Sequence, residues 1–117
     1  MQRFWPILSV ILIASGQAIA QDAAQRGWEL ESKGDAAGAR ELLQRSAANA
    51  PNDFRAQLAY AEFLDRHRDP GARSAYSKAL DLPGADRKSV AHRLAMLDLL
   101  AGDRTSAAKH LEIYRAA

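Results

Sequence analysis

The sequence predicts an all-α fold built from three helical hairpins. Asp35, Asp69 and Asp103 stand at equal intervals of ~34 residues, and a fixed period of this length is typical of a helical-hairpin repeat array. Between the turn signals, apolar and small residues recur at i, i+3, i+4 and i+7, which is the spacing of one helix face. No segment alternates with a period of two, so no sheet is expected. The repeats are expected near residues 21–52, 53–85 and 86–117.

Residues 1–20 are expected to be a signal peptide that lies outside the repeats. Arg3 precedes a short apolar run, and Ala18-Ile19-Ala20 supplies a small-x-small ending, which together make a secretory signal. A membrane-spanning helix needs ~20 mostly apolar residues, and this run is shorter. Cleavage after Ala20 predicts export to the periplasm or the extracellular space, with no membrane span in the mature chain. The chain has no cysteine, which excludes disulfides and a lipid-anchoring cysteine.

In the first repeat, we expect one helix over residues 22–32 and a second helix after Asp35. Gly34 can adopt the left-handed conformation that ends a helix, and the Asp35 carboxylate can accept backbone N–H bonds as an N-cap. Pro51 ends the second helix. The apolar and small residues of that helix follow one face: Ala39, Leu42, Leu43, Ser46, Ala47 and Ala50.

The second and third repeats follow the same pattern. A helix over residues 53–66 precedes Asp69, which is expected to be an N-cap with Pro70 at the first helical position. The third repeat begins near Asp86, and its last helix covers residues 104–115. One small residue keeps the same place after each repeated aspartate, where two helices approach most closely. These residues are Ala39, Ala72 and Ala107.

Composition and motif content exclude several classes of function. Sixteen Lys and Arg against fourteen Asp and Glu give a net charge of +2, and no basic block suits a nucleic-acid partner. The three histidines lack metal-ligand spacing, so no metal and no cofactor are expected, and His92 and His110 are expected on helix surfaces. Ser89, His92 and Asp98 come without a nucleophile elbow or an oxyanion loop, so we do not expect an enzyme.

Residues at matching places in the three copies form a degenerate signature: Gly27, Leu30, Ala39, Leu43, Ser46 and Pro51; then Ala61, Leu64, Ala72, Tyr76, Ala79 and Pro83; then Ala95, Ala107 and Leu111. This signature resembles the tetratricopeptide repeat family, whose helix–turn–helix unit has ~34 residues. The resemblance covers essentially the whole chain after residue 20. Two departures are the absence of an early aromatic, where copy one has Ala23, and a turn in copy two that is one residue short. The resemblance implies a right-handed α-solenoid with a concave face lined by the first helix of each pair.

Transferred by register, the resemblance implies a protein-binding groove lined by Trp28, Glu31, Arg55, Glu62, Asp65, Arg66 and His92. Arg55 and Arg66 are its main cations, and the carboxylate clamp of the family is not carried over, because this face has no lysine or asparagine. Trp28 has two interpretations, either an aromatic anchor for a ligand or a cover for the open end of the first repeat. The three leucines between residues 97 and 100 are expected in the core.

The last helix offers a second candidate surface, formed by Ala107, Leu111 and Tyr114. This stripe would face a further layer, so it is a docking face for a partner or a second copy, or the chain is a piece of a longer repeat protein. We expect a non-catalytic protein–protein interaction module, an adaptor or assembly scaffold of the bacterial cell envelope or periplasm, with a protein or peptide partner. The alternatives are a self-associating structural repeat segment and an N-terminal accessory domain of a longer protein or enzyme complex.

Overall fold

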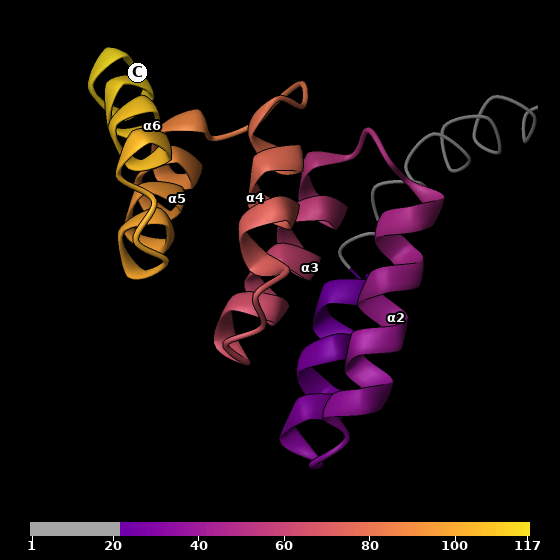
Figure 1. The fold of residues 1–117 in the computed structure, drawn as a ribbon. Coiled ribbons are helices and arrows are strands. Elements are labelled where there is room, and N and C mark those ends of the chain that lie inside the picture. The colour runs from indigo at the N-terminus through magenta and orange to yellow at the C-terminus, as the bar shows by residue number, and fades with distance from the viewer. Residues whose placement is uncertain (1–21) are drawn as a thin grey trace, which may run out of the picture.

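The computed structural model describes residues 22–117, and the regular structure in that range is helical throughout (Figure 1). Residues 22–32 form the first helix. The helices that follow are α2 (Ala36–Asn49), α3 (Phe54–Arg66), α4 (Ala72–Leu80), α5 (Arg87–Leu100) and α6 (Arg104–Ala116). The prediction of an all-α fold is confirmed, since residues 22–117 contain no strand. The predicted signal peptide of residues 1–20 lies outside the described residues.

The helices form three hairpins that lie in a row (Figure 1). Residues 22–32 lie beside α2, α3 pairs with α4, and α5 pairs with α6. Among α2 to α6, the helices that pack closely are always consecutive in the chain, so α2 with α3 and α4 with α5 join one hairpin to the next. No helix within residues 22–117 is both long enough and apolar enough to cross a membrane.

Aspartates begin four of these helices. The N-caps of α2, α3, α5 and α6 each accept a backbone N–H of the first helical turn, which satisfies a donor that has no partner inside the helix. The prediction for α4 is wrong, because its N-cap is Gly71 and the helix starts at Ala72 rather than Pro70. The Asp69 carboxylate accepts the Gly71 N–H at 2.8 Å, and this local turn delays the start of the helix.

The turn inside each hairpin is closed by the same backbone hydrogen bond. The N–H of the repeated aspartate donates to the carbonyl five residues earlier. These pairs, each 2.8 Å apart, are Asp35 with Leu30, Asp69 with Leu64, and Asp103 with Asp98. The residue before each aspartate has a positive φ, which is 84° at Gly34, 54° at Arg68 and 78° at Gly102. These are helix-ending Schellman turns, and they align the three hairpins residue by residue.

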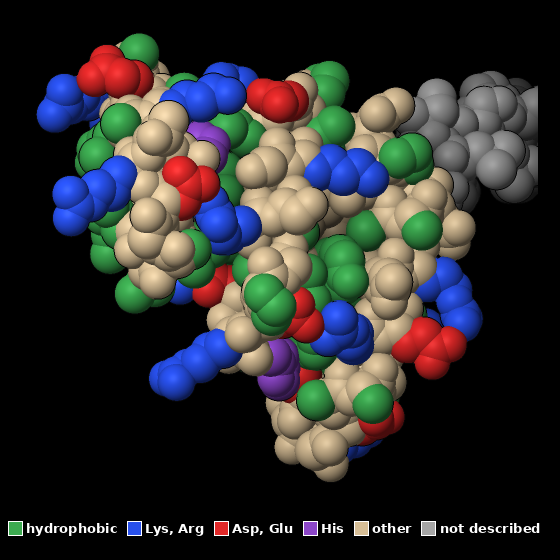
Figure 2. Space-filling model, in the orientation of Figure 1, with side chains coloured by type: hydrophobic (Ala, Val, Ile, Leu, Met, Phe, Trp, Pro, Cys, Tyr) green, Lys and Arg blue, Asp and Glu red, His purple; other side chains and the backbone are tan. Residues whose placement is uncertain are grey.

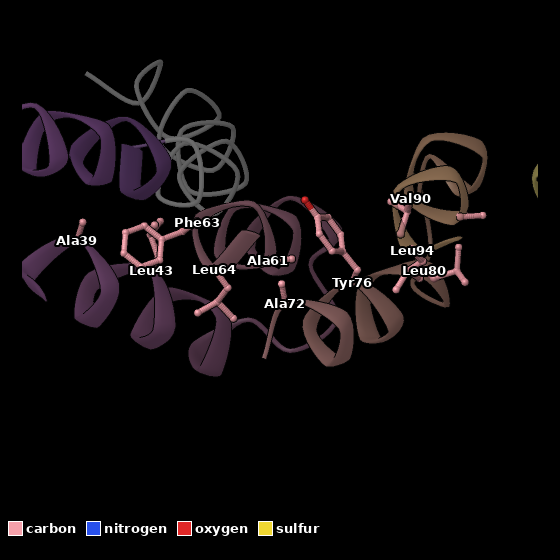
Figure 3. Close-up of a cluster of buried hydrophobic side chains, with 11 residues drawn as sticks. Ala39, Leu43, Ala61, Phe63, Leu64, Ala72, Tyr76, Leu80, Val90 and Leu94 are labelled. Carbon is pink, nitrogen blue, oxygen red and sulfur yellow. The ribbon is translucent and has the colours of Figure 1, made fainter. Parts of the chain in front are cut away.

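One hydrophobic core runs through the row of hairpins (Figure 3). The predicted small-residue contacts are confirmed, since Ala39, Ala72 and Ala107 are 0%, 3% and 2% exposed. The core cluster consists of Ala39, Leu43, Ala61, Phe63, Leu64, Ala72, Tyr76, Leu80, Val90, Ala91 and Leu94. Because this cluster draws on all three hairpins, each hairpin depends on its neighbour to bury its apolar face.

Candidate functional site

A groove of about 190 Å³ lies between the first helix and α3. Four of the seven residues predicted for the groove line it, and they come from both helices: Trp28, Arg55, Glu62 and Arg66. Apolar side chains, including Leu43 and Leu58, complete its walls. The groove therefore combines an apolar floor with an aromatic ring, two cations and one carboxylate.

Trp28 is held in place while more than half of it stays open to solvent. The residue is 55% exposed, and the Arg66 guanidinium lies 4.1 Å from the centroid of its ring, a cation–π contact. The other end of the interaction is fixed, because Arg66 Nη2 donates to Glu31 Oε2 at 2.7 Å. This placement fits the interpretation of Trp28 as a groove residue, since an exposed and pre-positioned aromatic can anchor a ligand.

Glu31 lies beneath this arrangement and binds two partners. His67 Nε2 lies 2.8 Å from Glu31 Oε1, on the opposite oxygen from the one that accepts from Arg66. Burial alone would raise the pKa of Glu31, but the hydrogen bonds from Arg66 and His67 hold that pKa below its usual value. The carboxylate therefore serves to orient Arg66 and does not itself face a ligand. His67 is the C-cap of α3.

Arg55 and Glu62 give the groove charges that are not fully engaged. Within residues 22–117, the Arg55 side chain takes part in no salt bridge shorter than 4.0 Å. Partial burial in the groove raises the pKa of Glu62, although much of the residue faces water. The groove thus has an apolar floor, a cation at Arg55 and a carboxylate at Glu62 that is more easily protonated than usual. Such a site suits a short peptide that carries both apolar and charged groups.

The structure places two other predicted groove residues elsewhere. Asp65 accepts hydrogen bonds from Arg93 Nε at 2.6 Å and Nη2 at 2.7 Å, and from the Tyr76 hydroxyl at 2.9 Å. These bonds, that of Arg93 foremost, lower the pKa of Asp65. Asp65 thus ties α3 to α4 and α5. His92 is exposed, as predicted, and its ring centroid lies 5.1 Å from that of Tyr114 on α6.

The junctions between hairpins share an ion pair that the sequence analysis missed. Arg40 Nη1 lies 2.8 Å from Asp69 Oδ2, and Arg73 Nη2 lies 2.9 Å from Asp103 Oδ2. Each arginine stands early in the second helix of a hairpin and reaches the turn of the next hairpin. Hydrogen bonds from Ser106, together with Arg73, lower the pKa of Asp103 to about 2. An arginine four or five residues after an aspartate of the repeat is the sequence signal that could have identified this pair.

A buried polar cluster inside the third hairpin was also missed. Asp98 is 1% exposed, and it accepts hydrogen bonds from Arg73 Nε at 3.0 Å and His110 Nδ1 at 2.6 Å. The prediction that His110 lies on a helix surface is wrong, because its side chain is 12% exposed and turned toward this carboxylate. Ser89 Oγ donates to Asp86, and Asp98 bonds to Arg73 and His110, so within residues 22–117 neither Ser89 nor Asp98 is hydrogen-bonded to His92.

Gln57 is a second buried polar residue that the sequence analysis did not single out. It is 4% exposed, and its Nε2 donates to the carbonyls of Ala47 at 2.7 Å and Ala50 at 3.1 Å. These carbonyls lie at the end of α2 and have no partner within that helix. Gln57 therefore caps α2 from the neighbouring hairpin. Its identity gave no signal because a glutamine in a helix is usually a surface residue.

The predicted core position of the leucines near residue 100 is wrong for two of them. Leu99 and Leu100 are 53% and 80% exposed, and Met96 on the same helix is 45% exposed. The inner side of α5 is already filled by other residues, among them Val90 and Leu94. The end of α5 therefore turns its leucines outward.

The candidate docking face on α6 is largely turned inward. Ala107 is 2% exposed and cannot reach a partner. Leu111 and Tyr114 are half-buried, and Tyr114 packs against the core cluster. The stripe therefore packs within the third hairpin, and only the outer parts of Leu111 and Tyr114 remain open.

Charges and potential metal ligands are dispersed over the described surface. On the face shown in Figure 2, acidic and basic side chains are interspersed, without a large patch of one sign. Within residues 22–117, no group of three or more His, Asp or Glu side chains gathers as a metal site would require. The Trp28 groove is one place in this part of the molecule where an exposed aromatic ring and charged side chains line an apolar floor.

Comparison with known proteins gives no relative from which a function could be transferred. No family model, characterised protein or solved structure matches this chain at a significant level. The resemblance to the tetratricopeptide repeat family stays a prediction. Function is therefore inferred from the geometry of the groove and of the hairpin junctions.

Proposed function

We propose that this chain is a non-catalytic protein–protein interaction module, an adaptor or assembly scaffold, that binds a peptide segment of a partner in the Trp28 groove. The observation that carries the proposal is the exposed Trp28 ring, stacked against an Arg66 that Glu31 holds in place. Tryptophan and arginine are the residue types that most often dominate binding energy at interfaces. Because these groups are already positioned, little conformational entropy is lost when a ligand binds.

We infer that the row of hairpins is a right-handed α-solenoid of tetratricopeptide type. Two observations support this inference. The three turns are closed by the same hydrogen bond at the same interval, and the Arg–Asp pair of the first junction recurs at the second. Repeated contacts between neighbours only are what a solenoid requires.

We further propose that the protein works in the bacterial envelope or periplasm after loss of residues 1–20. The signal-like pattern of those residues supports this location. Mass spectrometry of the full-length gene product, recovered from the periplasmic fraction of a bacterial host, should show a mature N-terminus at Gln21. Recovery of the protein only in the cytoplasm, with residues 1–20 intact, would contradict the proposal.

A second candidate function, self-association as a structural segment, is favoured by the exposed leucines of α5. The repeated junction pair argues against end-to-end stacking. In the third hairpin, the place of Arg40 and Arg73 is taken by Ala108, so a copy stacked on α6 would lack this ion pair. We therefore expect a monomer by light scattering.

If a dimer forms instead, Leu111→Glu tests whether the α6 face is its interface. Dissociation of the dimer by this change would identify the α6 face, and a dimer that persists would exclude it.

Groove binding can be tested by capture from an envelope extract with immobilised full-length protein. We expect that Trp28→Ala, and Arg55→Glu combined with Arg66→Ala, lose a protein that the wild type retains, while the helical circular dichroism signal persists. Arg26→Ala is the matched control, since Arg26 lies on the same helix, its side chain is 64% exposed, and within residues 22–117 it pairs with Asp22 alone. Equal capture by the wild type and both groove variants would reject the groove.

Partner binding can then be followed through Trp28 itself. Trp5 is the only other tryptophan in the sequence, so the Trp5→Phe chain reports on the groove alone. Addition of the purified captured protein should change the emission of Trp28. An emission spectrum that stays constant at saturating partner would place the contact outside the groove.

A further inference from the structure

The outer faces of α3 and α5 differ at corresponding positions. The turn hydrogen bonds align Glu62, Asp65 and Arg66 of α3 with Met96, Leu99 and Leu100 of α5. The α5 residues are 45%, 53% and 80% exposed. A surface that is charged in the second hairpin is thus apolar, and open to water, in the third. We call Met96, Leu97, Leu99 and Leu100 the α5 apolar face.

A hollow of about 750 Å³ lies beside this face, between α5 and the turn that joins α3 to α4. Leu97 and Leu100 line it together with Asp65, Asp69 and four arginines, Arg66, Arg68, Arg73 and Arg93. Both carboxylates are paired with arginines, Asp65 with Arg93 and Asp69 with Arg40. Met96 and Leu99 lie outside the hollow, so the apolar face continues beyond it.

Three of these arginines are occupied within the protein and one is not. Arg66 pairs with Glu31, Arg73 with Asp98 and Asp103, and Arg93 with Asp65. Within residues 22–117, no group accepts a hydrogen bond from the Arg68 side chain. The wall of the hollow therefore holds one guanidinium that lacks an anion.

Arg68 also holds an unusual backbone conformation. Its φ is 54°, at the place where the other two hairpins have glycine. A non-glycine residue in the left-handed region is strained by about 1 kcal/mol. Since the Arg68 side chain makes no hydrogen bond or salt bridge inside the described residues that would offset this strain, the charge points to a ligand outside the fold.

We propose that the hollow and the α5 apolar face together bind an acidic, leucine-bearing amphipathic helix of a partner protein. A carboxylate of that helix pairs with Arg68, and its apolar side chains pack on Leu97, Leu100 and Met96. An amphipathic helix presents apolar groups at i, i+3, i+4 and i+7, and Met96 and Leu100 are themselves spaced one helical turn apart. This inference rests on the proposed function in taking the ligand to be a polypeptide, but it uses a different hollow, which has only Arg66 in common with the lining of the Trp28 groove.

Arg68, which is unpaired within the described residues, selects the charge of the ligand, and the length of the apolar face selects its size. A basic or neutral helix would leave Arg68 without an anion and would face like charges. A small carboxylate could occupy the hollow but would leave Met96 and Leu99 exposed. A helix with glutamates flanking its leucines satisfies both features.

The test uses the full-length protein and a labelled synthetic peptide, blocked at both ends, with leucine at i, i+3, i+4 and i+7 and glutamate on the flanking positions. Fluorescence anisotropy should show saturable binding. Arg68→Gly should weaken binding about tenfold, as expected for loss of one charge-assisted hydrogen bond, while the unfolding midpoint stays unchanged or rises. Leu100→Ser should weaken binding similarly. Arg26→Ala is the matched control and should bind as the wild type does, because Arg26 lines neither the Trp28 groove nor the hollow.

A peptide with glutamine in place of glutamate provides a second control. It should bind more weakly to the wild type and should be insensitive to Arg68→Gly. Absence of saturable binding to the wild type would overturn the inference, as would equal affinity for the Arg68→Gly variant.

Two further outcomes separate this inference from the proposed function. If Trp28→Ala and Arg55→Ala abolish binding while Arg68→Gly does not, the peptide occupies the Trp28 groove, and only the present inference fails. If binding survives Trp28→Ala and falls with Arg68→Gly, the α5 site stands by itself. A dimer that Leu100→Ser converts to a monomer would show that a second copy covers the face, and would also overturn the inference.

Discussion

The second and third hairpins share the same turn hydrogen bond but differ in the distribution of polar residues. At the base of the turn, the second hairpin buries Leu64 where the third buries Asp98. On the outer face the third hairpin is the more apolar of the two, since the exposed Glu62 of the second hairpin corresponds to the exposed Met96. The turn differs as well, with Arg68 against Gly102. One hairpin is thus apolar inside and charged outside, and the other is partly inverted.

The difference shows how to separate structural from functional departures within a repeat. The carboxylate of Asp98 is saturated by Arg73 and His110, so its departure is explained inside the molecule. The side chain of Arg68 and the outward leucines of α5 have no such explanation within the described residues. A residue that differs between corresponding positions of the repeat, and that has no partner within the described residues, is the better guide to a ligand.

The largest effect should follow from removing the buried carboxylate of the third hairpin. Asp98→Ala leaves His110 and one side of Arg73 without an acceptor in a buried site, and should lower the free energy of unfolding by about 2–4 kcal/mol. Urea denaturation followed by circular dichroism measures the change. Asp98→Leu with His110→Leu, which copies the apolar character of the second hairpin, should recover most of the loss. A loss below about 1 kcal/mol in Asp98→Ala would show that the network is not structural.

A smaller effect is expected where the second hairpin caps the first. The residue that corresponds to Gln57 in the third hairpin is Ala91. Gln57→Ala should therefore cost about 1–2 kcal/mol, because the carbonyl of Ala47 loses its donor, while that of Ala50 keeps the Asp53 N–H at 3.1 Å. The end of α2 should then open more often, so the amides there should exchange with solvent faster than in the wild type. Unchanged exchange there would mean that water replaces the glutamine without loss.

Much of the fold was readable from the sequence, because the signals are local and repeated. Helix positions followed from aspartate caps and from apolar spacing, and the start of α4 was missed by two residues because Asp69 bonds to Gly71 instead of opening the helix. The register of Ala39, Ala72 and Ala107 was correct because small residues at a close crossing are a steric requirement. These features could be predicted because they depend on residues that are close together in the sequence.

The candidate site was only partly predictable, because side-chain pairing depends on distant residues. The groove position of Trp28 followed from register, but Asp65 was assigned to the groove without knowledge of Arg93 on another hairpin. Asp98 and His110 are polar residues whose burial is possible only because they meet Arg73 across a junction. The outward leucines of α5 could not be told from core leucines, since an apolar residue gives the same sequence signal in either position.

The turns provide a prediction of opposite sign for corresponding residues. Arg68→Gly should raise the free energy of unfolding by about 0.5–1 kcal/mol, because glycine adopts a positive φ without strain. Gly102→Arg should lower it by about 1 kcal/mol for the same reason. Thermal unfolding of both variants beside the wild type measures the shifts. Destabilisation by Arg68→Gly would mean that the arginine makes a stabilising contact in solution, and would weaken its assignment to a ligand.

The smallest effect concerns Glu62, whose place in the third hairpin is taken by Met96. Partial burial raises its pKa above the usual value of 4.5, so protonation favours the folded state. This contribution is complete below pH 4.5 and is lost as the pH rises through the folded-state pKa. Glu62→Gln imitates the protonated acid and should stabilise the protein at pH 7 by about 0.3 kcal/mol after allowance for solvent screening. At pH 4 the same change should have almost no effect.

Glu31→Gln should destabilise the protein at pH 7, since the pKa of Glu31 is lowered and its ionised form favours folding. This contribution of Glu31 is lost as the pH falls through its folded-state pKa, which lies below 4.5. Urea midpoints of the two variants at both pH values provide the measurement, and shifts of the same sign at pH 7 would contradict the assigned roles of these glutamates beside Arg66.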